Sequence, residues 1–108
     1  MAATISWSQE SLDDIASIAE YISRNSPYHA GRVVEAFFEL SESIAEHPMA
    51  GRIVPELGRE QVRERFVYSY RVLYEIGLTQ IDMLAVIHGR QSLESIAERL
   101  AGAENRDL

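Results

Sequence analysis

The sequence predicts an α+β fold made of an N-terminal strand, a helical hairpin, and then a three-stranded antiparallel sheet with a short C-terminal helix. Two patterns carry this prediction. Between residues 62 and 88, apolar and polar residues alternate with the period of two that is typical of strands. Between residues 9 and 47, apolar residues recur at the three-to-four spacing of amphipathic helices. A chain of 108 residues can bury one hydrophobic core, so we expect a single domain over residues 1–108.

The first half of the chain predicts a strand followed by two helices. Residues 3–7 alternate in the manner of a short strand, and Ser8 can cap a helix that runs from residue 9 to about residue 24. In this helix the adjacent acids Asp13 and Asp14 diverge by about 100°, so a solvated face is expected there rather than a metal site. Ser26 and Pro27 then predict the start of a second helix, over about residues 28–47.

Three strands are expected at residues 62–68, 70–76 and 80–88, with Gly77 supplying a positive φ in the last turn. Residues two apart point to the same side of a sheet, so each strand presents two faces. The expected core face contains Tyr70, Val72, Tyr74, Ile76, Ile81, Met83, Ala85 and Ile87. On the opposite, outer face, four basic residues should surround four apolar ones: Arg63, Arg65, Arg71 and His88 around Val67, Leu73, Leu84 and Val86.

The outer face is the expected site of function, because an exposed apolar patch ringed by charge usually marks an interface. A last helix over residues 93–101 follows the sheet, with Gly102 at the C′ position and a frayed tail after about residue 102. Two arrangements are open at this stage. Either the apolar patch is left for a partner, or Leu93, Ile96 and Leu100 of the last helix cover it.

Composition restricts the class of ligand and the compartment. The net charge of −7 argues against general affinity for nucleic acid, although the charge is uneven, with −6 in residues 1–50 and +1 in residues 51–92. All the basic side chains other than histidine are arginines, which suit bidentate contacts and do not titrate. The chain has no cysteine, no signal peptide and no membrane-length apolar segment, so a soluble cytoplasmic protein is expected. It has no phosphate-loop, zinc or Ca²⁺ motif, so no cofactor and no metal are expected.

One constellation at the sheet can carry chemistry. It consists of His88, Arg90, Arg71, Arg63 and Arg65. Such a cluster can bind a phosphodiester, with His88 as general acid or base and the arginines stabilising developing charge. The same residues also fit a solvated sheet face on which arginines pair with carboxylates. Arg52, in the irregular stretch over residues 49–61, is likewise either a target contact or a tie between a loop and a helix end.

Four short motifs occur in order along the chain. They are the loop Pro48-x-x-Gly51-Arg52, Arg63 before a strand, Tyr70-Arg71-Val72-Leu73-Tyr74, and Ile87-His88-Gly89-Arg90. From residue 7 to about residue 90, their order and spacing resemble the RelE/ParE superfamily of type II toxin–antitoxin toxins, and within it the ParE branch.

The resemblance implies a toxin whose cognate ParD-like antitoxin is encoded beside it and binds through a segment that folds on contact. ParE-type toxins poison DNA gyrase, whereas RelE-type relatives cleave mRNA on the ribosome. This chain has no lysine and no tyrosine after Tyr74, which departs from the cationic face of RelE-like nucleases and favours gyrase inhibition. An mRNA endonuclease, or a non-toxic interaction module on the same scaffold, are the alternatives.

Candidate roles for individual residues follow from the resemblance and from the outer face. The candidates for contact with the target are Arg52, Arg63, Arg65, Arg71, His88 and Arg90. If the chain is a nuclease, the catalytic residues are expected to be His88, Arg71 and Arg90. The candidates for antitoxin binding are Val67, Leu73, Leu84 and Val86, whose burial under the antitoxin would remove apolar area from water.

Overall fold

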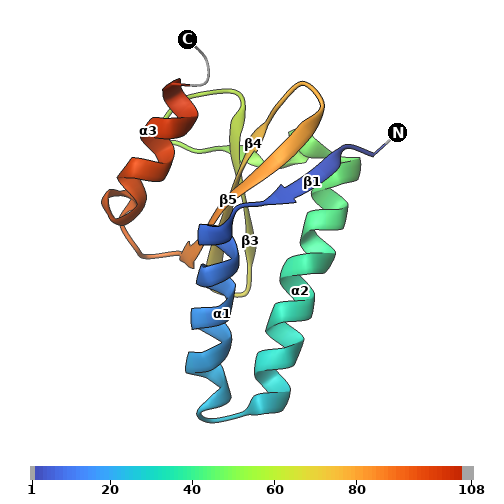
Figure 1. The fold of residues 1–108 in the computed structure, drawn as a ribbon, viewed down its shortest axis with the longest axis vertical. Coiled ribbons are helices and arrows are strands. Elements are labelled where there is room, and N and C mark those ends of the chain that lie inside the picture. Colours follow the sequence, from blue (N-terminus) through green and yellow to red (C-terminus); the bar gives the residue numbers. More distant parts are fainter. Residues whose placement is uncertain (1, 106–108) are drawn as a thin grey trace.

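The computed structural model describes the backbone of residues 2–105 and the side chains of residues 2–101 (Figure 1). Its elements are β1 Thr4–Trp7, α1 Gln9–Ser23, α2 Pro27–Glu46, β2 Arg52–Ile53, β3 Val62–Val67, β4 Tyr70–Ile76, β5 Gln80–His88 and α3 Ala97–Asn105, with 3₁₀ turns at Pro48–Ala50 and Leu93–Ile96. The strands form one sheet, with the α1–α2 hairpin on one face and α3 on the other (Figure 1). The predicted α+β class is confirmed.

The sheet has the order β1-β5-β4-β3-β2 over the described residues. The three antiparallel strands β3, β4 and β5 are those expected from the sequence. The N-terminal strand β1 adds parallel to β5, with Ile5 opposite Ile81 and Trp7 opposite Met83. Strand β2, which was not predicted, pairs with β3 and lies inside the stretch expected to be irregular. Two residues are too short to show an alternating pattern, so β2 has no signal of its own.

Both predicted helix starts are confirmed. The Ser8 hydroxyl accepts a hydrogen bond from the Ser11 backbone N–H at 3.0 Å, and the Ser26 hydroxyl accepts one from the His29 backbone N–H at 3.1 Å. Each bond satisfies a donor that the first helical turn leaves without an intrahelical partner. Pro27 begins α2, where its missing N–H costs nothing. No helix among the described residues is long and apolar enough to cross a membrane.

A β-bulge in β5 reverses the predicted faces of its second half. Tyr74 pairs with Met83 but the preceding Leu73 pairs with Ala85, so Leu84 is an extra residue on β5. An extra residue exchanges the two faces of the strand beyond it. Val86 therefore joins the core under the hairpin, whereas Ala85 and Ile87 face α3. The predicted faces of these three residues are wrong, because residues 83–87 are all apolar and their alternation carries no register.

The faces of β3 and of the end of β5 also differ from expectation. Residues paired directly across a sheet point to the same side. Arg63, Arg65 and Val67 lie opposite Tyr74, Val72 and Tyr70, and thus on the hairpin side. His88 lies opposite Tyr70, on that side as well. Their predicted place on the outer face is wrong, and that face keeps only Arg71, Leu73 and Leu84 of the eight residues expected there.

The outer apolar face is covered within the chain itself. Leu73 is fully buried and Leu84 is 6% exposed, in one cluster with Leu93, Ile96 and Leu100 from the C-terminal segment. The expectation of a wet patch is wrong, and the alternative, in which the last helix covers this face, is confirmed. The helix also continues past Gly102 to Asn105, so its predicted end at Gly102 is wrong. Residues 106–108 of the predicted tail lie outside the described residues.

Two turns have backbone φ angles that differ from what their residue types predict. Gly77 does not have the predicted positive φ. A side chain there would place Cβ 2.9 Å from the Gln80 carbonyl oxygen, so glycine is needed for close approach rather than for its backbone freedom. Tyr68, in the β3–β4 turn, has a φ of +52°, a region in which a bulky residue is an outlier.

Candidate functional site

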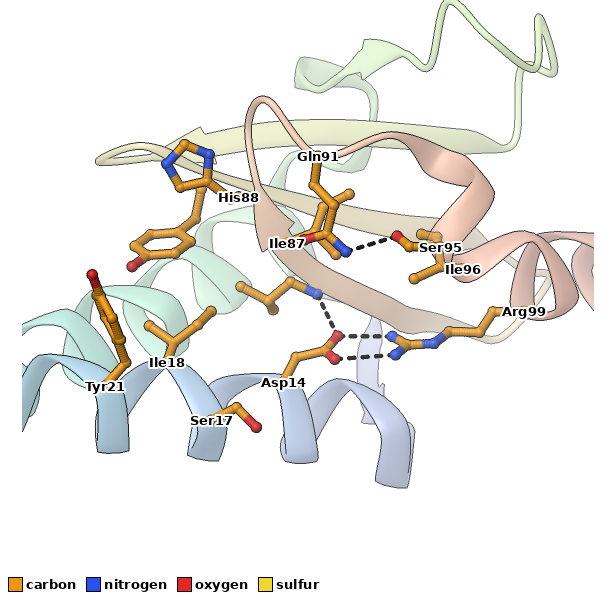
Figure 2. Close-up of a pocket in the computed structure, with 12 residues that line it drawn as sticks. Asp14, Ser17, Ile18, Tyr21, Ile87, His88, Gln91, Ser95, Ile96 and Arg99 are labelled. Carbon is orange, nitrogen blue, oxygen red and sulfur yellow. Dashed lines mark hydrogen bonds and ion pairs between the residues drawn. The ribbon is translucent and has the colours of Figure 1, made fainter.

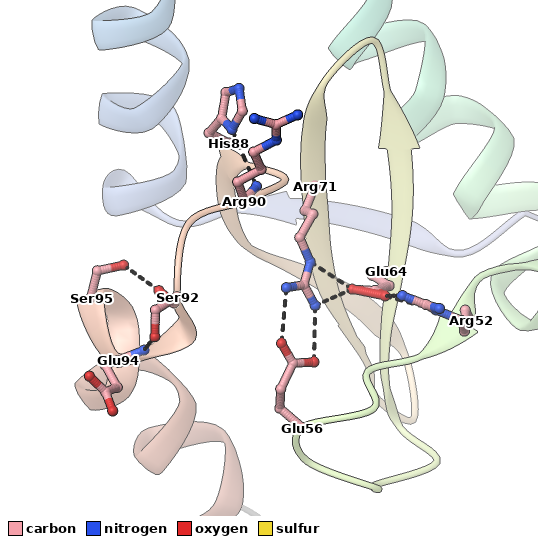
Figure 3. A network of polar contacts seen from close by, with 9 residues as sticks. All are labelled: Arg52, Glu56, Glu64, Arg71, His88, Arg90, Ser92, Glu94 and Ser95. Carbon is pink, nitrogen blue, oxygen red and sulfur yellow. Dashed lines mark hydrogen bonds and ion pairs between the residues drawn. The ribbon is translucent and has the colours of Figure 1, made fainter.

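Arg71, the central cation among the predicted site residues, lies in a polar network on the α3 side of the sheet (Figure 3). Its Nε donates to Glu64 Oε1 at 2.8 Å, and its two terminal nitrogens donate to the Glu56 carboxylate at 3.0 and 3.2 Å. Arg52 donates to the other oxygen of Glu64, with Nε at 2.9 Å. Two arginines and two carboxylates therefore balance one another.

Burial strengthens this network. Arg71 is 6% exposed and Glu64 is 1% exposed, so both charges depend on each other for hydrogen bonds that water cannot supply. The hydrogen bond to Glu56 raises the pKa of Arg71, and the same bond lowers the pKa of the Glu56 carboxyl. Arg71 can reach a phosphate only if Glu56, whose side chain is half-exposed, moves away.

His88 and Arg90 lie apart from Arg71. The His88 ring packs edge-on against Tyr70, with ring centroids 5.9 Å apart, and Nδ1 of His88 accepts from the Arg90 backbone N–H at 3.2 Å. Both side chains are exposed, and Figure 3 shows the Arg71 guanidinium pointing away from them toward Glu64 and Glu56. The three residues that a nuclease would need are thus not brought to one face of the sheet.

The remaining predicted cations have structural contacts. Arg63 is 9% exposed and donates to the backbone carbonyls of Glu60, Met49 and Gly51, which fixes the chain on both sides of β2. Arg65 is half-buried on the hairpin side. Arg52 is exposed, and its guanidinium carbon lies 6.0 Å from the centre of the Phe66 ring. Arg52 ties β2 to Glu64 of strand β3, so the predicted tie to a helix end is wrong, and its role as a target contact stays a prediction.

Asp14 and Arg99 form a site that sequence analysis did not identify (Figure 2). Among the described residues, the β5 edge that pairs with β1 has no strand partner beyond Met83, because β1 ends at Trp7. Asp14 Oδ2 accepts from the Val86 backbone N–H at 2.9 Å, and Arg99 Nη1 donates to the Leu84 carbonyl at 3.1 Å. The two side chains bind each other through contacts of 2.7 and 3.1 Å, and this bonding raises the pKa of Arg99.

The Asp14–Arg99 pair takes the place of a missing strand and joins α1, β5 and α3. Asp14 was expected on a solvated face; its contacts join segments more than 70 residues apart, so no local pattern could reveal them.

Two adjoining cavities lie where α1 meets the ends of β4 and β5. One, of about 430 Å³, runs from the Asp14–Arg99 pair to His88, and Figure 2 shows its lining. The other, of about 410 Å³, continues past His88 to His29 and Tyr68. Tyr21, Tyr70 and His88 line both. Among the described residues, no cluster of histidines and carboxylates could hold a metal ion.

Residues 5–93 match the family model described as ParE toxin of type II toxin-antitoxin system, parDE. The chain belongs to this family. The resemblance to the ParE branch, drawn from the four sequence motifs, is therefore confirmed. The chain is a type II toxin–antitoxin toxin of the ParE/RelE superfamily.

Relatives of this ParE-family toxin carry both branch names. Toxin RelE2 of Caulobacter vibrioides is 28% identical over 86 residues, which are 80% of this chain and 94% of that protein. The chromosomal ParDE system of P. aeruginosa contains a chain of similar fold, with a TM-score of 0.67 and 16% identity over 81% of this toxin and 96% of that chain. A chain of the RelBE2 complex of Mycobacterium tuberculosis gives a TM-score of 0.54 and 22% identity, over 82% and 99% respectively. The shared fold does not separate the two branches.

Proposed function

We propose that this toxin acts in the cytoplasm by inhibiting DNA gyrase and does not cleave RNA. The observation that argues against RNA cleavage is the separation of Arg71 from His88, and gyrase inhibition is what the resemblance to the ParE branch implies. Cleavage of a phosphodiester needs a general acid or base and a charge-stabilising cation at the same phosphate. Here Arg71 is neutralised by Glu64 and Glu56 on the α3 side, and His88 lies on the hairpin side.

The alternative is ribosome-dependent mRNA cleavage, which the name of the Caulobacter relative favours. Two assays in parallel separate the functions: supercoiling by purified gyrase titrated with toxin, and cleavage of mRNA on translating ribosomes. We expect loss of supercoiling without cuts in the mRNA. Cuts that disappear in His88→Ala, with supercoiling intact, would reverse the proposal. If supercoiling and mRNA both stay intact and expression causes no growth arrest, the function is that of a non-toxic interaction module.

We further propose that a ParD-like antitoxin binds beside α3. The four antitoxin candidates Val67, Leu73, Leu84 and Val86 are buried or partly buried in the free toxin, so they cannot make the first contact. Next to Leu73 and Leu84 an apolar groove of about 300 Å³ is open to solvent. It is lined largely by side chains of the C-terminal segment, together with two carboxylates: Leu57, Leu93, Ala97, Leu100 and Ala101, with Glu56 and Glu94. Burying such a groove gains roughly 25 cal/mol per Å² before ordering costs.

The groove can be tested without disturbing the core. Ala97 lines it and is exposed, so Ala97→Asp should weaken binding of the cognate antitoxin in calorimetry while the toxin keeps its thermal midpoint. Ala16 is equally exposed on α1, outside the groove, and Ala16→Asp is the matched control. Equal antitoxin affinity in both variants would exclude the groove.

A further inference from the structure

One end of the molecule is poor in carboxylates in a chain whose net charge is −7. Residues 21–34, 65–74 and 83–93 contain five arginines and two histidines but no aspartate or glutamate. Of these arginines, Arg71 is neutralised by Glu56 and Glu64 on the α3 side, and Arg24 pairs with Glu20 at 3.7 Å. The fold brings the three segments together: the His29 and Tyr68 rings are 6.1 Å apart, the Tyr70 and His88 rings are 5.9 Å apart, and all three segments line the 410 Å³ cavity. We call this surface the hairpin end, with the exposed residues Tyr21, Tyr28, His29, Tyr68, His88 and Arg90.

The hairpin end has the composition of a protein-binding surface. Tyr21, Tyr28 and Tyr68 are 66%, 75% and 62% exposed, although tyrosine rings carry much apolar area. Tyrosine and arginine are the residues that most often dominate the binding energy of interfaces. The Tyr28 hydroxyl also accepts a hydrogen bond of 3.2 Å from Arg32, which holds that cation at the surface.

The backbone conformation of Tyr68 also supports a role in binding. A φ of +52° suits glycine and asparagine and costs a bulky residue stability. The core does not explain the choice of tyrosine, because the ring is largely exposed and its aromatic contact is edge-on to His29. Strain retained at an exposed aromatic residue favours a role in binding.

We infer that the hairpin end binds an acidic protein surface, and that this surface belongs to the toxin's target rather than to its antitoxin. An acidic partner is repelled by most of this chain and meets few carboxylates at the hairpin end, which also sets the orientation of approach. The groove beside α3 has Glu56 and Glu94 at its rim and therefore suits a different partner. A nucleic acid is less favoured, because the net charge of −7 opposes a polyanion over the whole molecule. Only the identity of the target, gyrase, rests on the proposed function.

Two full-length variants test the surface, and one of them is expected to keep its fold. Tyr68→Asn removes the ring but places a residue that tolerates positive φ, so its thermal midpoint should equal or exceed that of the wild type. Arg90→Glu reverses an exposed charge. Leu78→Asp is the control, since Leu78 is fully exposed in the β4–β5 turn, at the other end of the sheet (Figure 1).

The readouts are growth arrest on expression, inhibition of purified gyrase, and calorimetric affinity for the cognate antitoxin. We expect Tyr68→Asn and Arg90→Glu to weaken toxicity and gyrase inhibition by roughly thirtyfold, the effect of one interface hot spot, while antitoxin affinity and the control stay unchanged. If growth arrest is lost in both variants but wild-type toxin leaves gyrase active, the target is another protein and the surface assignment stands.

Four results would overturn the inference. They are wild-type toxicity in both variants, a parallel loss of antitoxin affinity, no growth arrest by the wild type, and binding of the wild type to fluorescent single-stranded oligo(dT) that Arg90→Glu abolishes. The last result would mean that the hairpin end binds a nucleic acid, whose bases stack on its tyrosines.

Discussion

Leu84→Asp tests whether the C-terminal segment is a permanent part of the core. Leu84 is 6% exposed and packs with Leu93 and Ile96 on the α3 side of the sheet. Removing a buried leucine side chain costs about 2–5 kcal/mol, and leaving a polar group buried without a partner adds roughly 1–3 kcal/mol. We therefore expect the free energy of unfolding to fall by about 4–6 kcal/mol. At about 4 °C per kcal/mol for a domain of this size, the thermal midpoint should fall by at least 15 °C.

The assay is thermal and urea unfolding followed by circular dichroism, with Leu78→Asp as the control. Leu78 is fully exposed, so the same change of side chain there should alter the free energy of unfolding by about 0.5 kcal/mol or less. Leu84→Ala separates the loss of apolar contacts from the burial of charge. A folded Leu84→Asp protein with the wild-type midpoint would refute the reasoning, because it would mean that α3 leaves this face at no cost and that the patch is free to serve as an interface.

Three further predictions concern the polar contacts. Glu56→Gln should destabilise the toxin at neutral pH. Because Arg71 lowers the pKa of Glu56, the extra stability of the wild type is fully present above the unfolded pKa of about 4.5 and is lost as the pH falls through the lower folded pKa. The free energies of urea unfolding of the two proteins should therefore converge in acid. Asp14→Asn should lower the thermal midpoint. A double-mutant cycle with Arg99→Gln should give a coupling energy of about 0.5–3 kcal/mol. If the two changes in the free energy of unfolding simply add, the pair does not hold α3 to α1. Glu64→Gln should cost about 3–5 kcal/mol, since it leaves buried Arg71 short of a counter-charge, and urea unfolding with an unchanged midpoint would contradict this.

The elements with local signals could be predicted from the amino-acid sequence. Ser8 and Ser26 cap helices through hydrogen bonds to residues three positions later, and such short-range contacts can be read directly from the chain. The period of β4 correctly separated Tyr70, Val72 and Tyr74 from Arg71 and Leu73, because β4 has no bulge and alternates strictly. The four ordered motifs sufficed to indicate the ParE family.

The positions of the site residues depended on long-range pairing. His88 and Arg71 belong to different strands, and the extra residue Leu84 decided which face His88 occupies. A bulge within a run of apolar residues leaves no trace in the pattern, because every register buries a similar side chain. The sequence could therefore propose the constellation of cations but not whether its members meet.

Long-range contacts in the folded chain set which charges are neutralised and which surface remains open. Arg71 meets Glu64 across a strand pair and Glu56 from a loop, and Arg99 meets Asp14 over 85 positions of the chain. The absence of carboxylates in residues 21–34, 65–74 and 83–93 is visible in the sequence, but their convergence at the hairpin end is not. Hydrophobic burial and strand pairing bring these segments together. Both act between residues that are far apart in the sequence, where no periodic pattern predicts which residues meet.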